Sequence, residues 1–397
     1  MKIGIYLPDV SPDAGGASSL LRTIQKEIQD LHDDYNEYFF LYYGLESTTL
    51  LSEIKGFKYL NLNFYKVSIS LKQRIKNKIK QRFGFSIKEV SKFDEVAKNI
   101  GIDLFWFPSP GIYDLSYPFI YTVWDLGHRR TPYFPEVSRS GWLWQARENT
   151  YQKMLYKASY IVTGNEEGKK EILENYSVPP SKIKIAPFPV AAFCYEDEKV
   201  PSFEVPEKYF FYPAQFWPHK NHICILEALV KLREKDGLEP IVFFTGSDKG
   251  NKKYIESKIK DYGLENQVKI TGFLRDEELK YLYTHATAMI FASLMGPNNM
   301  PPIESSFLNC PVIITDLDGH KEQLGDTALY FNGYNPNDLA EKMKYLLINE
   351  DDRTKIIEKE KKLSVEFSKI NYFSCIKKII DEFSLIRKTW GTDFIHL

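Results

Sequence analysis

The stretch Phe291-Ala-Ser-Leu-Met-Gly-Pro-Asn-Asn-Met-Pro-Pro-Ile-Glu304 decides the fold. It follows the apolar run 288–292 and precedes a helix-like run that ends near Leu308. A second apolar run, 311–316, comes directly afterwards. Strand, turn, helix and strand in this order form a βαβ unit, the building block of a parallel sheet. Ligands of such sheets bind at the loop after the carboxyl end of a strand, so we expect an α/β fold with a site in this loop.

The start of the helix in this stretch predicts an anion site. Pro301 and Pro302 suit the first helical turn, where a missing N–H costs nothing. The free N–H groups of that turn, with the helix dipole behind them, attract an anion. Glu304 lies one turn further on, and beside an anion its carboxylate needs hydrogen bonds from hydroxyls. Phosphate next to a diol is what a nucleotide sugar presents; the alternative is that Glu304 only caps the helix. The residues that we expect to bind a nucleotide sugar here are Asn299, Met300, Pro301 and Glu304.

The same stretch resembles the donor-binding signature of the family 4 glycosyltransferases, which are retaining enzymes of GT-B fold. Their pattern has a Glu, seven residues and a second Glu, within a stretch similar to EGFGLPPLEA. Residues 301–304, Pro-Pro-Ile-Glu, match its second half, and the resemblance implies that Glu304 binds the ribose of the donor. The first Glu, which contacts the transferred sugar in the family, falls on Gly296 here, so the resemblance does not name the donor sugar.

Length and composition set the class of protein. A chain of 397 residues is expected to form two domains, and its 43% hydrophobic and 15% aromatic content suffices for two cores. This content excludes a disordered or fibrous protein. The net charge of −1 provides no general attraction for nucleic acid, so we expect no nucleic-acid partner.

The four cysteines do not form a recognisable metal or disulfide pattern. Their positions are Cys194, Cys224, Cys310 and Cys375. Cys224 and Cys310 lie in apolar runs and are interpreted as buried thiols. The scattered spacing argues against a zinc site or a disulfide framework and fits a reducing cytosol, so we expect a cytoplasmic protein.

Two glycines follow the first apolar run of the chain. Lys2–Leu7 is predicted to be the first strand of a parallel sheet, and a periodic helix begins near Leu20. Gly15 and Gly16 between them would let the backbone approach a ligand at the start of that helix. The family resemblance implies that such a loop approaches the donor diphosphate, whereas the alternative is an ordinary turn.

The segment 71–83 is strongly basic and amphipathic. Leu71, Ile75, Ile79 and Phe83 recur every four residues among six Lys and Arg residues, with no acid. Such a helix would lie on an anionic bilayer, at roughly 1 kcal/mol per basic residue near the surface, and would place the protein at the inner face of the cell membrane. The alternative is that the apolar stripe packs on the domain. No stretch reaches 18 consecutive apolar residues, so no membrane span is expected.

A second candidate site follows the predicted strand 119–124. Asp125, His128, Arg129 and Arg130 come directly after it. The segment resembles the family's stretch HDLQH, which lines the reaction cleft, with Asp125 and His128 matching and Trp124 replacing a His. We therefore expect Asp125 and His128 to be catalytic, and the alternative for His128 is a loop histidine bonded to backbone. The two arginines are expected either to hold an acceptor phosphate or to be solvated.

The second half begins with another strand, helix and charge pattern. The predicted strand 209–212 is followed by Gln215 and by Lys220 at the start of a helix, where its ammonium would bind an anion with roughly 1.5–3 kcal/mol. In the family an Arg and a Lys clamp the diphosphate; Lys220 fits and is expected to be catalytic by holding the charge of the departing phosphate, and the Arg position falls on Gln215. The resemblance also implies that Gly272 and Phe273 cradle the nucleotide base. We expect no metal, because the pair His219 and His222 has no nearby carboxylate or Cys partner.

The pattern breaks between Val190 and Val205, where the chain is polar and rich in proline. We therefore expect two Rossmann-like domains, 1–190 on the acceptor side and 191–372 on the nucleotide-sugar side, facing each other across a cleft. The GT-B resemblance implies that the terminal helix 373–397 packs back on the first domain.

Three functions are compatible with this pattern. The first is transfer of a sugar from a UDP-, GDP- or dTDP-linked donor to a glycan or polyprenyl-diphosphate-linked acceptor, in cell-surface polysaccharide synthesis such as that of O-antigen or capsule. The second is a sugar-nucleotide epimerase or hydrolase, which needs a proton-transferring pair such as Asp125 and His128. The third is a non-catalytic partner subunit, favoured by the departures at Trp124, Gln215 and Gly296.

Overall fold

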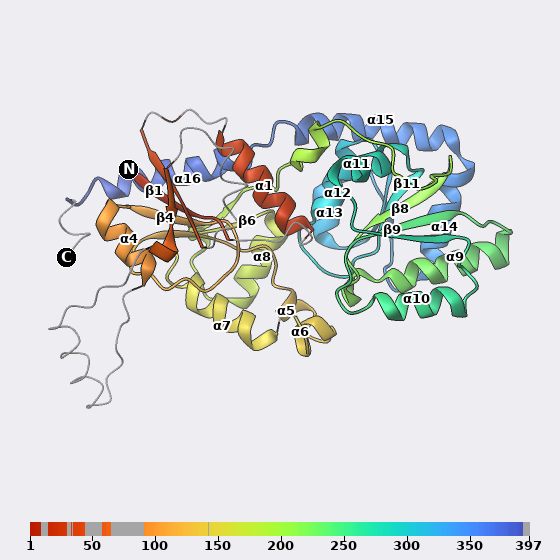
Figure 1. Ribbon diagram of the computed structural model, residues 1–397, viewed down its shortest axis with the longest axis horizontal. Helices are drawn as coiled ribbons and strands as arrows, with labels where there is room; N and C mark the ends of the chain where they lie inside the picture. Colours follow the sequence, from red (N-terminus) through yellow and green to blue (C-terminus); the bar gives the residue numbers. More distant parts are fainter. Residues whose placement is uncertain are drawn as a thin grey trace.

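The computed structural model describes residues 1–8, 15–29, 33, 35–43, 58–64, 91–141 and 143–391. Two parallel sheets organise them, and Figure 1 shows the two resulting lobes side by side. The expected α/β class with two Rossmann-like halves is confirmed. The division into domains at 190/191 stays a prediction, and the two sheets fall on either side of it. The expected basic helix 71–83 lies outside the described residues.

The first sheet has seven strands in the order β3-β2-β1-β4-β5-β6-β7. Its strands are β1 (Lys2–Tyr6), β2 (Glu37–Tyr42), β3 (Lys58–Asn61), β4 (Leu104–Phe107), β5 (Phe119–Thr122), β6 (Tyr160–Thr163) and β7 (Ile183–Ile185). Every residue of β4 and β5 is buried, because helices cover both faces of a parallel sheet. The register pairs Ile5 with Phe40 on one side and with Trp106 on the other.

The elements around the first sheet are short helices and 3₁₀ turns. They are α1 (Gly16–Gln29), η2 (Leu62–Phe64), α4 (Lys92–Ile100), α5 (Gly127–Arg130), α6 (Pro135–Ser138), α7 (Trp144–Leu155), α8 (Glu166–Asn175), η3 (Pro180–Lys182) and η4 (Ala192–Tyr195). Local chemistry sets their ends. The Asn165 side chain accepts from the Gly168 N–H and starts α8, and Gly101, at φ +80°, ends α4.

The second sheet has six strands in the order β10-β9-β8-β11-β12-β13. Its strands are β8 (Tyr209–Pro213), β9 (Ile241–Thr245), β10 (Val268–Gly272), β11 (Ala288–Phe291), β12 (Val312–Thr315) and β13 (Leu329–Phe331). The elements between and after them are η5 (Pro218–Lys220), α9 (His222–Asp236), α10 (Lys252–Asp261), α11 (Asp276–His285), α12 (Met300–Phe307), α13 (Asp318–Leu324), α14 (Pro336–Ile348), α15 (Glu350–Phe367) and α16 (Tyr372–Arg387). The predicted βαβ unit is thus β11-α12-β12.

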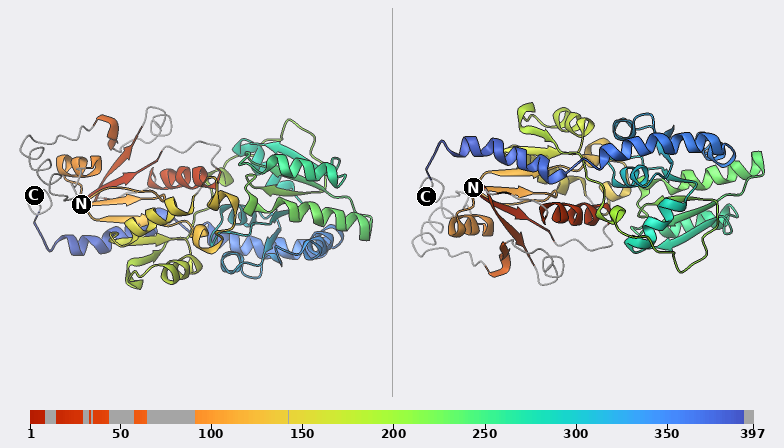
Figure 2. Two further views of the ribbon diagram at one scale, coloured as in Figure 1. Left: turned by 90° about the horizontal axis from the view of Figure 1, so that it is seen from below. Right: turned by 90° about the horizontal axis from the view of Figure 1, so that it is seen from above.

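The chain returns to the first lobe at its end. Figures 1 and 2 show α15 along the second lobe and α16 along the first. The Glu27 carboxylate of α1 accepts from the N–H groups of Tyr372 (3.2 Å) and Phe373 (2.8 Å), which begin α16. Arg387 near its end pairs with Asp103 at 2.7 Å. The helix α16 therefore packs on the first sheet's domain as an element from the other end of the sequence.

Two further expectations concern the cysteines and membrane-spanning helices. Cys224 and Cys310 are buried, 3% and 2% exposed, as predicted from their apolar surroundings. None of the helices in the described segments is both long and apolar enough to cross a membrane.

Candidate functional site

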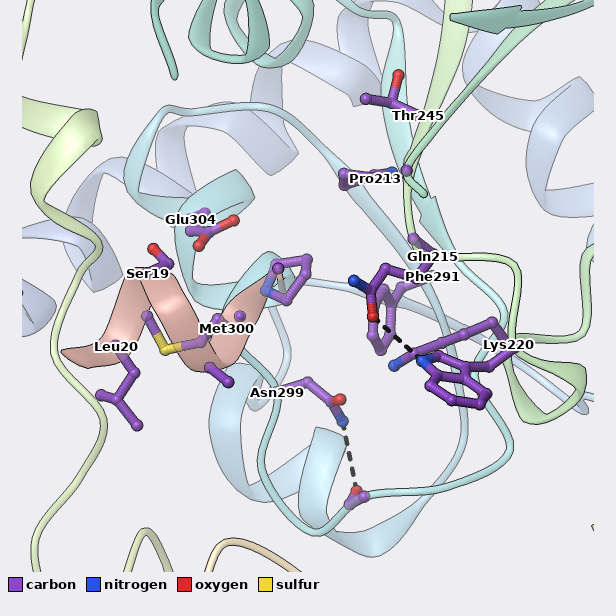
Figure 3. A pocket seen from close by; sticks show the side chains of 18 of the residues that line it. Ser19, Leu20, Pro213, Gln215, Lys220, Thr245, Phe291, Asn299, Met300 and Glu304 are labelled. Carbon is purple, nitrogen blue, oxygen red and sulfur yellow. Dashed lines mark hydrogen bonds between the residues drawn. The ribbon is translucent and has the colours of Figure 1, made fainter. Parts of the chain in front are cut away.

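A cleft lies between the two sheets, where the loops at the carboxyl ends of their strands face each other. Its cavity volume is about 340 Å³, within the range of small-molecule sites. Figure 3 shows Ser19 and Leu20 of α1 opposite Lys220, with Glu304 and Asn299 between them. Of the predicted site residues, those that line the cleft are Gly15, Gly16, Asp125, Gln215, Lys220, Phe273, Asn299, Met300, Pro301 and Glu304. His128 and Gly272 are not part of this lining.

Lys220 lies at the end of η5, where β8 leads into α9, and its ammonium enters the cleft. The Nζ atom is 3.5 Å from the Ser293 hydroxyl and 4.8 Å from the centre of the Phe291 ring. Burial lowers the pKa of Lys220 to about 8, although the carboxylates of Asp125 and Glu136 act in the opposite direction. Within the described part of the chain no carboxylate is bonded to Lys220, and such a partly buried cation is suited to an anionic ligand.

The start of α12 offers fewer donors than the sequence predicted. The helix begins at Met300 with Asn299 as the preceding residue, so Pro301 and Pro302 occupy its second and third positions. Neither proline has an N–H group. Of the first three helical positions, Met300 alone therefore offers a free N–H donor. The helix dipole still favours an anion at this end.

Glu304 lies one turn into α12 and is 5% exposed. Its Oε2 accepts a hydrogen bond of 2.8 Å from the Tyr283 hydroxyl of α11. Burial raises the pKa of Glu304 to about 7; the Tyr283 hydrogen bond opposes this shift and the charge of Asp276 adds to it. Glu304 therefore accepts a hydrogen bond across helices as well as facing the cleft, and it is more than a local helix cap.

An ion pair between the lobes lies beside Glu304. Arg22 Nη1 of α1 is 2.8 Å from Asp276 Oδ2 at the start of α11, and both residues line the cleft. The pair is about a third exposed, so its contribution to stability is small, on the order of 1 kcal/mol or less. The positive charge of Arg22 offsets the two neighbouring carboxyl groups, Asp276 and Glu304.

The glycine pair at the start of α1 lies against the second lobe. Gly15 has φ +67°, and a Cβ there would lie 3.3 Å from Gln215 Nε2. A Cβ on Gly16 would lie 3.7 Å from the Met300 side chain. Gly15 therefore allows the backbone to approach Gln215, whereas Gly16 lies at ordinary contact distance from Met300 at the start of α12.

Asp125 faces the cleft from the end of β5, next to Trp124. Its Oδ1 accepts from Arg147 Nη2 and from the Gly127 N–H, both at 2.7 Å. Burial by itself would raise the pKa of Asp125, but these donors and the charge of Arg147 hold it below its usual value. Asp125 is thus an ionised, oriented carboxylate.

His128 is placed behind the cleft and not in it. Its ring is fully buried, 3.1 Å from Glu148 and 3.4 Å from the Tyr176 hydroxyl, both through Nε2. Burial and the charge of Arg147 lower the pKa of His128 to about 4, so the ring is neutral at neutral pH. This position gives no support to a direct catalytic role for His128, and its partners are side chains, not the backbone as the alternative expected.

The two arginines beside it pair with carboxylates. Arg129 Nε donates to Glu148 Oε2 at 2.7 Å, and Arg130 is within 3.5 Å of Glu167, Glu171 and Glu174. These four glutamates of α7 and α8 give no support to an acceptor phosphate held by the arginines, whereas the expectation of a solvated side chain agrees with Arg130, which is 44% exposed.

The histidine pair of the second lobe has separate surroundings. His219 Nδ1 lies 2.6 Å from Glu136 Oε1 of the first lobe, while His222 packs against Phe216 at 4.5 Å between ring centres. Among the described residues, no group of three or more His, Cys, Asp and Glu side chains is placed to hold a metal ion.

The loop 293–299, which joins β11 to α12, is held by the first lobe. Asn165 Nδ2 donates to the Pro297 carbonyl at 2.6 Å. A Cβ on Gly164 would lie 2.1 Å from Asn298 Nδ2, so the Asn298 side chain rests on the backbone before α8. The Glu322 carboxylate of α13 accepts from two N–H groups at the start of α8, at 2.7 and 2.9 Å. The loop therefore depends on both lobes for its position.

Sequence reasoning missed residues that support the site from distant positions in the sequence. Arg22, Tyr283 and Asp276 line or support the site, and Asn165 holds its loop. Only Asn165 carried a local signal, as the residue before a helix, and that signal does not indicate its second partner. The other contacts join positions far apart in the sequence.

Comparison with known proteins finds a family model that matches part of the chain. Residues 196–363 match the family model described as Glycosyl transferases group 1. The chain is 27% identical over 194 residues to O-antigen chain mannosyltransferase RfbU of Salmonella typhimurium, across 47% of this chain and 51% of that protein. It is 32% identical over 124 residues to the serotype-specific mannosyltransferase WbdA of Escherichia coli, across 31% of this chain and 15% of that protein. The chain therefore spans about half the length of the first relative and less of the second.

Solved structures resemble the whole chain. A glycosyltransferase of Rickettsia africae matches with a TM-score of 0.67 and 16% identity, over 98% of this chain and 99% of that one. Anabaena HepE, solved in complex with UDP, matches with a TM-score of 0.68 and 15% identity, over 97% and 100%. These likenesses establish the fold, which is the expected GT-B arrangement of two Rossmann-like halves.

Proposed function

We propose that this chain, whose residues 196–363 form a glycosyl transferases group 1 domain, is a retaining glycosyltransferase that uses a nucleotide-sugar donor. The observation that carries the proposal is the cleft itself. It brings Lys220, the start of α12 and Glu304 together on one lobe, opposite Gly16 and Asp125 of the other. A cation and a helix end suit a diphosphate, and a carboxylate suits the ribose hydroxyls beside it.

The proposed reaction breaks the bond between the sugar C1 and the donor phosphate oxygen, and the electron pair stays on that oxygen. The acceptor hydroxyl forms the new bond to C1 on the same face and gives its proton to the departing phosphate. Lys220 and the Met300 N–H stabilise the charge that develops on the phosphate. Because these groups are built into the cleft, we propose that the step needs no metal ion.

Asp125 is proposed to orient the acceptor. Its Oδ1 accepts from Arg147 and Gly127, which orients the carboxylate, and we propose that Oδ2 accepts a hydrogen bond from the attacking hydroxyl. The electrostatic influence of Asp125 on Lys220 places the two groups near each other, as transfer between their substrates requires.

The relatives favour a mannosyl donor and a cell-surface glycan. RfbU and WbdA are both mannosyltransferases, and RfbU acts on an O-antigen chain. We therefore propose nucleotide-activated mannose as the first donor to test, and a glycan or polyprenyl-diphosphate-linked glycan as the acceptor. Surface contact with the membrane through the segment 71–83 is part of the same proposal.

The test is release of nucleoside diphosphate from a panel of UDP-, GDP- and dTDP-sugars that includes GDP-mannose, with and without a polyprenyl-diphosphate-linked glycan. We expect one donor to release its nucleotide faster with acceptor, and NMR of the product to show the anomeric configuration of the donor. Binding of donors without any release would favour the non-catalytic partner. Free sugar or an epimerised donor formed without acceptor would favour the hydrolase or epimerase.

A further inference from the structure

Asn299 presents a side-chain amide at the edge of the cleft, directly before α12. Unlike Asn165 at α8, it makes no side-chain hydrogen bond that caps its helix. Its Nδ2 instead donates to the Gly296 carbonyl at 3.4 Å and lies 3.0 Å from His320 Nε2 of α13. The amide is therefore held by groups outside its own helix.

The hydrogen-bond pattern of His320 fixes the orientation of that amide. His320 is fully buried, and its Nδ1 lies 3.0 Å from the Thr315 carbonyl, which can only accept, so Nδ1 carries the hydrogen. Burial lowers the pKa of His320 to about 4, so the ring is neutral and Nε2 is an acceptor. The atom of Asn299 that faces Nε2 must then be the donor, Nδ2.

The oxygen of the amide is consequently the atom available to a ligand. Both hydrogens of Nδ2 are used, by Gly296 and by His320, and within the described segments Oδ1 accepts no hydrogen bond. In Figure 3 a dashed line marks a hydrogen bond of the Asn299 amide nitrogen, and the amide oxygen points away from that line. Asn299 lines the cleft, so this oxygen is a fixed acceptor at its wall.

The order of groups along α12 indicates which part of a donor would meet this oxygen. Glu304 lies five residues after Asn299, about 7.5 Å along the helix axis at 1.5 Å per residue. The diphosphate is proposed to lie at the start of the helix, near the Met300 N–H and Lys220. With the ribose on the Glu304 side of the diphosphate, the group on the Asn299 side is the transferred sugar.

We propose that Asn299 contacts the transferred sugar, with Oδ1 accepting a hydrogen bond from one of its hydroxyls, and that His320 is the positioning residue that holds the amide in this orientation. This inference rests on the proposed function. It assigns to an uncharged amide the recognition of a sugar hydroxyl next to Gly296, where no carboxylate is present.

The experiment compares binding of a nucleotide sugar with binding of its nucleoside diphosphate. Calorimetry is carried out on the full chain with GDP-mannose and GDP, and with UDP-glucose and UDP. For whichever pair the protein binds, Asn299→Ala should weaken the nucleotide sugar about five- to tenfold, as loss of one hydrogen bond implies, and the nucleoside diphosphate less than about twofold. His320→Phe should give the same selective loss, and His320→Gln, whose Oε1 can accept from Asn299, should restore most of the affinity.

The matched control is Asn335→Ala. Asn335 also precedes a helix of the second lobe, α14, but its side chain caps that helix, and it does not line the cleft. This variant should bind both ligands as the unaltered protein does. Equal losses of nucleotide sugar and nucleoside diphosphate in Asn299→Ala, or no loss of either, would overturn the inference while leaving the proposed function intact. Failure of the unaltered protein to bind any nucleotide would overturn both.

Discussion

At the scale of single residues, the site rests on two ionisable groups whose pKa values lie close to neutrality. Burial raises the pKa of Glu304 to about 7 and lowers that of Lys220 to about 8. The proposed function requires each group in its charged form, Glu304 to accept from ribose hydroxyls and Lys220 to attract the diphosphate. Between these two pKa values the majority of both groups is charged. The affinity of the cleft for a nucleotide sugar should therefore fall on either side of this pH range, once for each group.

The first prediction is a maximum of nucleotide-sugar affinity between about pH 7 and pH 8. Affinity should rise as Glu304 ionises and fall as Lys220 loses its proton. The measurement is calorimetry from about pH 6 to about pH 9 with a nucleotide sugar, because its diphosphate is fully ionised across that range.

Two variants assign the two limbs of this profile. Glu304→Gln should remove the acidic limb, and Lys220→Met should remove the alkaline limb and weaken binding by about tenfold or more, as loss of a charged hydrogen bond implies. Lys231→Met is the control, since Lys231 pairs with Glu234 on the surface of α9 and does not line the cleft. A flat profile in the unaltered protein, or one that neither variant alters, would refute the role of these groups.

The sign for stability is opposite to that for binding at Glu304. Its pKa is raised on folding, so the native state holds a proton that the unfolded chain has released between about pH 4.5 and pH 7. This contribution to the free energy of unfolding is present at low pH and is lost as pH rises through about 7. The hydrogen bond that Glu304 accepts from the Tyr283 hydroxyl limits this loss of stability.

At the scale of elements, the loop 293–299 determines where α12 begins. Thr315 Oγ1 donates to the Ser293 carbonyl at 2.7 Å, and Gln323 Nε2 donates to the Asn299 carbonyl at 2.9 Å, so β12 and α13 hold the two ends of the loop. Gly296 in its middle has φ +113°, a backbone conformation that side chains rarely adopt. A Cβ there would lie 2.9 Å from Asn299 Nδ2.

The second prediction is that restoring a carboxylate at this point harms the site. Gly296→Glu should lower the free energy of unfolding by about 1–3 kcal/mol through backbone strain and should weaken nucleotide-sugar binding, because the new Cβ displaces the Asn299 amide. Thermal unfolding and calorimetry measure the two effects. Gly250→Ala is the control, since Gly250 has φ +100° with no atom near its Cβ position, and it should show the strain without the loss of binding. Tighter binding by Gly296→Glu would contradict this account of the loop.

The elements themselves were largely predictable from the sequence. The predicted strands 2–7, 119–124 and 209–212 agree within two residues with β1, β5 and β8, because each is an apolar run. The strand β11 and the start of α12 followed from the βαβ pattern in the same way. Periodicity and capping are local, so a sequence reports them directly.

The contacts between elements were not predictable by the same means. His128 matched a motif, yet Glu148 and Tyr176 hold its ring behind the cleft, and nothing in the motif reports on α7. Pro301 and Pro302 were correctly placed in the first turn of the helix. The prediction noted that their missing N–H groups do not weaken the helix, but it overlooked that the same groups are then not available to bind an anion. Pairs such as Asn165 with Pro297 are separated by 132 positions, which no periodicity spans.

At the scale of the whole molecule, the site depends on how the two lobes are held. The loop 293–299 contacts the first lobe through Asn165. Glu136 of that lobe accepts from the His219 N–H at 3.1 Å and also bonds to the His219 ring. Both partners of the second contact are buried, 1% and 3% exposed. The lobes are thus joined next to the cleft by buried polar contacts. Lys220 and Glu304 belong to one lobe, so a shift between the lobes leaves their spacing unchanged. The same shift moves the proposed acceptor side of the cleft relative to them.

The third prediction concerns Asn165→Ser. The serine hydroxyl can still cap α8, but it cannot reach the Pro297 carbonyl, which then loses its donor. We expect the turnover rate to fall about tenfold, within the cost of a buried unsatisfied carbonyl, while the dissociation constant for nucleoside diphosphate changes less than about twofold. Small-angle scattering without ligand should give a larger radius of gyration.

Asn371→Ser is the matched variant for this prediction. Asn371 also caps a helix, α16, by accepting from the Ser374 N–H, and its side chain has no recorded contact with the second lobe among the described residues. It should leave turnover, affinity and radius of gyration unchanged. If both variants behaved alike, the Asn165 contact would have no role in holding the lobes.

The most direct test of the account is a crystal structure of the protein with a bound nucleoside diphosphate. The account predicts the terminal phosphate within hydrogen-bonding distance of Lys220 Nζ and of the Met300 N–H, and the ribose hydroxyls on the Glu304 carboxylate. A nucleotide bound outside the cleft, or bound within it with its phosphates away from Lys220 and the start of α12, would contradict the account.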